Sequence, residues 1–243
     1  MKRLYVLAMV TFVTLIGLGA WTAFAQQGIR LHGTVPATGL PSTEKLPPDV
    51  RPDTLSRMPP ATMDEIKSEE EKKIFQSFLD RGYNAKRLHG ATVLRSRFPI
   101  VARAYNEVIN AYLREDAGLD EKYGELAILT SCREMNERYE YSTHRVRAER
   151  LGISKAAIDV LVHNKDVTGL DEKEATIIKF GREMFRGEKV ASKTFADAER
   201  HFGRNGTLAI SLLVGYYANN ALLFRAYDQH RPPERLELPT FPD

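Results

Sequence analysis

The stretch GTLAISLLVGYYANNALLFRAYD, residues 206–228, decides the fold of this 243-residue chain. Its composition and spacing predict a helix that is apolar on nearly every side for about four turns, unlike the other helical stretches. A helix that is apolar all round must be buried all round. We therefore expect a central helix, or one that also packs against another subunit.

The chain upstream of this stretch also follows helical spacing, from Met63 onward. Apolar residues recur at helical intervals from Asp64 to Leu79, and Ser154 and Asp171 are predicted to begin two later helices. Further helices are predicted near 98–114, 121–134, 136–151, 154–163, 171–186, 192–202 and 205–228, with glycines at most of the breaks. No run alternates as a half-buried strand does. We predict an all-α fold in one principal domain, residues 63–243.

The first 25 residues have the pattern of an export signal. Lys2 and Arg3 precede an apolar stretch from Leu4 to Gly19, and Ala23-Phe24-Ala25 is a small-residue cleavage pattern. We expect cleavage after Ala25 and a periplasmic or secreted protein. The alternative is an uncleaved anchor, because the apolar stretch is nearly long enough to span a bilayer.

Residues 26–62 form a proline-rich segment, with seven of the twelve prolines of the chain. Proline fixes φ and removes a hydrogen-bond donor, so we expect an extended arm. It is either a disordered linker or a strap over the domain or a neighbouring subunit.

Charge and cysteine content exclude several classes of protein. Without residues 1–25 the chain keeps 33 basic and 32 acidic residues, a net charge of +1, which argues against a nucleic-acid partner. Cys132 is the only cysteine, so no disulfide forms within one chain. Ser131 and Glu134 make a capping-box pattern, which predicts Cys132 near a helix N-terminus with a favoured thiolate. The alternative is a small buried apolar residue.

The chemistry-bearing residues gather in the stretch 124–154. At about 100° per residue, Glu137, Glu140 and His144 share one helix face. A carboxylate one turn before a histidine can accept its ring N–H and fix its tautomer, as in a general base. Glu125 is a further carboxylate, with apolar neighbours. The alternatives are a solvated Glu–His pair and a metal site; the latter is disfavoured because the face offers one imidazole.

The same stretch resembles the carboxymuconolactone decarboxylase family, which is related to the AhpD-like alkylhydroperoxidases. The resemblance rests on ELAIL (125–129), YEYSTH (139–144) and RAERLGIS (147–154). Weaker matches are MPPATMDEI, FGREMFRGEKVASKTF and LLVGYYANNALLFRAYD, so the similarity covers roughly residues 58–238.

This resemblance implies an AhpD-like all-α fold that assembles into trimers or hexamers, with an active site near a subunit boundary and without a metal or cofactor. Glu137 and Glu140 stand where the peroxidase branch has its Cys-x-x-Cys, so thiol peroxidase chemistry is not expected. His144 matches the family histidine and Glu125 the upstream glutamate of its proton relay.

Acid–base chemistry on a small carboxylated or lactone substrate is then the expected activity, with His144, Glu125 and Glu140 as catalytic candidates. Tyr139 and Tyr141 are expected either to line the pocket or to be core aromatics. Candidate substrate contacts also include Glu137, His89 and three arginines at positions 133, 145 and 147, which are otherwise surface charges. The alternative function is an oligomeric, non-catalytic small-molecule-binding protein.

Overall fold

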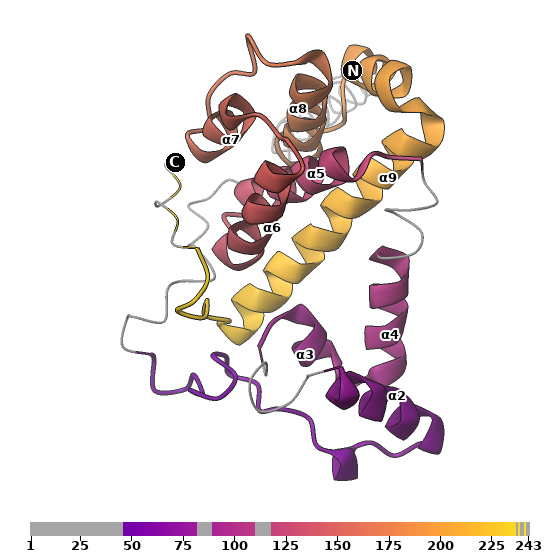
Figure 1. Cartoon of the computed structure of the whole chain (residues 1–243), viewed down its shortest axis with the longest axis vertical. Helices are drawn as coiled ribbons and strands as arrows, with labels where there is room; N and C mark the ends of the chain where they lie inside the picture. The colour runs from indigo at the N-terminus through magenta and orange to yellow at the C-terminus, as the bar shows by residue number, and fades with distance from the viewer. Residues whose placement is uncertain (1–45, 82–88, 110–117, 237, 239–240, 242–243) are drawn as a thin grey trace, which may run out of the picture.

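The structure, a computed structural model, describes residues 46–81, 89–109, 118–236, 238 and 241 (Figure 1). These residues form helices and connecting turns without a β-strand, and Arg51 and Ser56 form an isolated β-bridge. The all-α prediction is confirmed. The predicted export signal, residues 1–25, and the first part of the arm, residues 26–45, lie outside the described residues.

The long helix α9 (Ser192–Tyr227) runs through the middle of the molecule and packs against α5 (Glu121–Glu134) and α8 (Glu172–Arg186) (Figure 1). Its inward residues, among them Ile210, Leu213 and Phe224, are fully buried. Among the described helices α9 alone is long and apolar enough to cross a membrane, yet half of its most apolar window is covered by the protein itself. The helix is central, as predicted, but it is not buried all round, because Leu208, Leu212 and Leu222 remain exposed.

Gly203 divides α9 at the place where the sequence predicts a break. Its φ of 67° and ψ of 176° are not helical, so two helical segments meet there at a kink. This backbone conformation is open almost only to glycine. The kink lets the first segment pack beside α8 while the second crosses the core (Figure 1).

The predicted helix starts at Ser154 and Asp171 are confirmed by their capping bonds. The Ser154 hydroxyl accepts the Ala157 N–H at 3.0 Å and caps α7 (Lys155–Val162). The Asp171 carboxylate accepts the Lys173 N–H at 3.0 Å and caps α8. Such side chains satisfy N–H groups that have no partner within the helix.

The segment before α5 forms a smaller helical layer with a core of its own. It contains the short 3-10 helix η1 (Met63–Glu65), α2 (Glu69–Asp80), α3 (Ala91–Arg95) and α4 (Pro99–Glu107). Ile74, Phe75 and Phe78 of α2 pack on Ile66 and Ala102. The helix predicted from Asp64 is interrupted, because the Ser68 side chain caps a new helix at Glu69. The five-residue α3 was not predicted.

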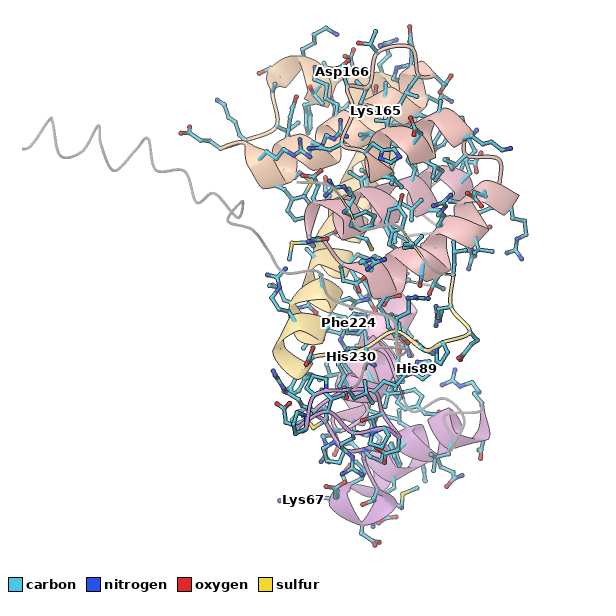
Figure 2. The ribbon with its side chains drawn as sticks, turned by 90° about the vertical axis from the view of Figure 1, so that its left-hand side faces the viewer. Lys67, His89, Lys165, Asp166, Phe224 and His230 are labelled. Atoms are coloured by element: carbon cyan, nitrogen blue, oxygen red, sulfur yellow. The ribbon has the colours of Figure 1, made fainter. Side chains whose placement is uncertain are left out.

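Gln229 joins this layer to the end of α9. Its side-chain amide donates to the carbonyls of Thr54 and Leu55 at 3.1 and 3.2 Å, and its Oε1 accepts the Gly90 N–H at 3.1 Å. The described part of the proline-rich segment, 46–62, is therefore held against the C-terminal end of α9. Figure 2 shows Phe224, His89 and His230 at this junction, midway between Lys67 at one end and Asp166 at the other.

Candidate functional site

The turn between α5 and α6 (Arg138–Arg150) places the two helices that carry the candidate site. Asn136 adopts a φ of 51°, and the Glu137 N–H donates to the Cys132 carbonyl at 2.7 Å. The two Glu137 oxygens accept the backbone N–H groups of Tyr139 and Glu140 at 2.6 and 2.8 Å. Glu137 is thus the N-cap of α6, which then runs back along α5.

The prediction that Glu137 shares one helix face with Glu140 and His144 is therefore wrong, because Glu137 is the N-cap of α6. Glu137 precedes the first turn of α6, and its carboxylate accepts hydrogen bonds from the helix backbone rather than from the imidazole. Burial and the nearby charge of Glu140 raise the pKa of Glu137. Helical spacing relates side chains only from Arg138 onward, where α6 begins.

His144 is paired with Glu125 across the two helices. Its Nδ1 lies 2.6 Å from Glu125 Oε2, the Glu125 side chain is 1% exposed, and the His144 side chain is 10% exposed. An ionised carboxylate only accepts hydrogen bonds, so toward ionised Glu125 the imidazole donates from Nδ1. The Tyr217 ring packs edge-on against the imidazole, with centroids 4.9 Å apart. The contact implied by the resemblance is present.

Glu140 approaches the other side of the imidazole. Its Oε2 lies 3.8 Å from His144 Nε2, which is too long for a direct hydrogen bond. Its Oε1 accepts the Asn220 Nδ2–H at 3.1 Å. The imidazole therefore sits between two carboxylates that play different parts. Glu125 contacts it directly, whereas Glu140 lies beyond hydrogen-bond distance of Nε2.

Arg147 is the predicted arginine that the structure brings to this cluster. Its Nε lies 3.2 Å from Glu125 Oε1, and its guanidinium also pairs with Glu121. Arg147 thus lies beside Oε1 of Glu125, while Oε2 contacts the imidazole. Arg145 instead pairs with Glu149 on the surface at 3.0 Å.

The other predicted substrate contacts lie apart from His144. The Tyr139 hydroxyl meets His89 Nδ1 at 2.5 Å, and its ring packs on Phe224. Arg133 donates to the Leu161 carbonyl at 3.0 Å. The Tyr141 ring packs on Phe241, and its hydroxyl has no hydrogen-bond partner among the described residues. These tyrosines fit the core-aromatic alternative.

Cys132 belongs to the end of α5, which corrects the expectation of a helix N-terminus. Ser131 does not cap a helix; its hydroxyl donates to the Val214 carbonyl at 2.8 Å. Cys132 is completely buried. Burial, together with the negative charges of Glu137, Glu140 and Glu125, raises the pKa of the Cys132 thiol. The thiolate is therefore disfavoured, and the small buried residue is the correct alternative.

Two polar residues of the cluster, Asn220 and Arg95, were not predicted from the sequence. Asn220 lies in the stretch that was interpreted as apolar all round, and it is 2% exposed. Arg95 of α3 donates to Asn220 Oδ1 at 2.6 Å. The signal for Asn220 was available, since Asn219 and Asn220 are a polar pair inside an otherwise apolar run. Arg95 carried no comparable signal, because its hydrogen-bond partners are more than 120 positions away.

The described residues contain no group of three or more His, Cys, Asp or Glu side chains that could hold a metal ion. What the cluster offers is a buried imidazole with one nitrogen tied to a carboxylate and the other facing a second carboxylate. Such an arrangement can accept a proton and return it. No protein-family model, curated protein or solved structure matches the chain.

Proposed function

We propose that this chain is an exported acid–base enzyme, a carboxymuconolactone decarboxylase-like lyase or isomerase that acts on a small carboxylated or lactone substrate. The observation that carries the proposal is the buried 2.6 Å contact between His144 and Glu125. It fixes the proton on Nδ1 and leaves Nε2 as the base. The active form is proposed to be a homo-oligomer, a trimer or a hexamer.

The proposed roles follow from the geometry of the cluster. His144 takes a proton from the substrate at Nε2 and returns it to the carbon that inherits the electrons. Glu125 orients the ring and stabilises the imidazolium that forms, as a buried carboxylate beside a histidine does. Glu140, 3.8 Å from Nε2, exchanges a proton with a substrate group that binds next to that nitrogen.

A second candidate function is a non-catalytic oligomeric small-molecule-binding protein. The observation that favours it is the closed network around Glu125, which contacts both His144 and Arg147 while 1% exposed. A network of this kind also stabilises a fold without any reaction. The two functions predict different effects of substituting His144: loss of catalytic rate for the enzyme, and loss of stability for the binding protein.

The test compares variants for the loss of lactone and the release of CO₂ across a panel of small lactone acids. We expect His144→Asn to lower the rate by about 10² to 10⁴, the range for one acid–base group, while fold and assembly persist. Glu125→Gln should lower the rate less, because the imidazole remains. The control is His163→Asn, which removes an exposed histidine that pairs with Asp159 at 3.5 Å.

The opposite result would favour the binding protein. In that case His144→Asn lowers the melting temperature while ligand binding, followed by thermal shift, is unchanged, and no member of the panel is turned over. His163→Asn should be silent in both assays, because its ion pair is solvated and contributes little.

A further inference from the structure

Arg95 is a buried cation whose protein partners are all neutral. The residue is 6% exposed. Its Nη2 donates to Asn219 Oδ1 at 2.7 Å and to Asn220 Oδ1 at 2.6 Å, and its Nη1 lies 3.4 Å from the Tyr216 hydroxyl. The guanidinium also stacks over the Tyr105 ring at 4.1 Å and lies 5.2 Å from the Tyr216 ring.

A buried charge normally has a counter-charge, because desolvation without one is costly. Glu134 shows the usual solution in this chain: its buried carboxylate accepts two bonds of 2.5 and 2.6 Å from the Arg186 guanidinium. Arg95 meets amides, a phenol and two aromatic faces, and no carboxylate of the described residues pairs with it. Its five N–H groups exceed the protein acceptors that they meet.

The surroundings of Arg95 add a second donor, the Tyr216 hydroxyl. The charge of Glu140 acts on Tyr216, but Glu140 is linked to Arg95 through Asn220 rather than by a direct contact. Burial raises the pKa of Tyr216 to about 12, so its hydroxyl stays protonated at neutral pH. The two tyrosine rings form flat walls on the guanidinium. An anion here would gain charge-assisted hydrogen bonds from Arg95, and a flat one would also stack on the rings.

Arg95 also adjoins the His144 cluster. Asn220 accepts from Arg95 through Oδ1 and donates from Nδ2 to Glu140, which lies 3.8 Å from His144 Nε2. Tyr216 is followed by Tyr217, whose ring packs on His144. The cation and the base thus lie on two sides of the same small polar cluster.

We propose that Arg95 and the Tyr216 hydroxyl bind the carboxylate of a small, flat carboxylic acid. The proposal deepens the proposed function, on which it rests, by naming the group that holds the substrate carboxylate while His144 handles the proton. It replaces Arg133, which the structure places against Leu161 instead.

The experiment measures binding of benzoate to the purified protein by calorimetry, with benzamide as the uncharged isostere. We expect saturable benzoate binding that is at least about tenfold tighter than benzamide binding, since a charge-assisted bond is lost with the amide. Arg95→Gln should weaken benzoate binding by about tenfold or more and leave benzamide binding unchanged. Arg95→Lys should fall between, because it keeps the charge and loses the planar fork.

The matched control is Arg97→Gln, two residues away, where the arginine already pairs with Glu65 at 2.9 Å. It should bind benzoate as the wild type does. His144→Asn should also bind benzoate within about threefold, because the carboxylate contact is separate from proton transfer. If His144→Asn loses catalysis and still binds benzoate, the result tests the proposed role of His144 and leaves the carboxylate site at Arg95 unaffected.

Two results would overturn the proposal. One is wild-type protein that does not bind benzoate more tightly than benzamide, which needs no variant and holds even if Arg95→Gln fails to fold. The other is folded Arg95→Gln, verified by circular dichroism, that binds benzoate with the wild-type affinity.

Discussion

At the residue scale, the His144–Glu125 pair shows how burial turns a common sequence pattern into a candidate base. A Glu–His pair on a solvated helix is worth a few tenths of a kcal/mol. Here the carboxylate comes from another helix and is 1% exposed, so the bond forms where competing water is scarce. His163 and Asp159, which are both about half exposed, are the solvated counterpart within the same chain.

Cys132 gives the first residue-scale prediction. Because the thiol is completely buried and its pKa is raised, iodoacetamide at pH 8 should leave it unmodified in the folded protein and modify it after denaturation. Intact mass before and after unfolding measures this. Cys132→Ala should leave any catalytic rate unchanged.

The same residue predicts the absence of thiol-dependent peroxidase activity, since one buried thiol has no partner for an intramolecular disulfide. Dithiol-dependent hydroperoxide turnover that disappears in Cys132→Ser would show that the buried thiol becomes accessible.

At the element scale, α9 carries two glycines with opposite backbone requirements. Gly203 has a φ of 67° and makes the kink, whereas Gly215 lies in a regular, exposed part of the helix with open space where a Cβ would be. Glycine in a helix interior costs about 0.5 to 1 kcal/mol relative to alanine, while an L-residue at the kink is strained by about 1 to 3 kcal/mol.

We therefore predict that Gly203→Ala lowers the free energy of unfolding by about 1 to 3 kcal/mol and that Gly215→Ala raises it by about 0.5 to 1 kcal/mol. Urea unfolding followed by circular dichroism measures both. The two variants add the same methyl group to the same helix, so each is the control for the other. Equal effects would show that the kink is not under conformational strain.

At the scale of the whole molecule, α9 presents an exposed apolar face. No charged residue lies between Asn205 and Phe224. Leu208, Leu212 and Leu222 remain 58%, 48% and 51% exposed even though the other faces of the helix are packed. Contiguous exposed apolar surface is typical of interaction sites. This surface supports the proposed homo-oligomer, in which a second copy covers it.

The corresponding prediction concerns Leu212→Glu. Light scattering should show that the wild-type protein is oligomeric at micromolar concentration and that the variant is shifted toward the monomer with unchanged helix content, because position 212 is outside the core. Val146→Glu, at an exposed position of α6, should keep the wild-type mass. A monomeric wild type would remove the homo-oligomer from the proposal.

Local sequence patterns determined the helices and two of their starting points, because these features depend on residues close in the sequence. Apolar spacing predicts the helices, the side chains of Ser154 and Asp171 mark two helix starts, and the apolar run at 206–228 predicts the central helix. The reason is that capping and amphipathicity act within about one turn.

Contacts across the chain were decided by tertiary packing alone. Whether Glu137 caps α6 or faces His144 depends on the turn that α5 imposes, and the environment of Cys132 depends on where α5 ends. Arg95 meets Asn220 across 125 positions, a pairing that no periodicity encodes, because a helical pattern gives the face of a side chain and not the helix that packs against it.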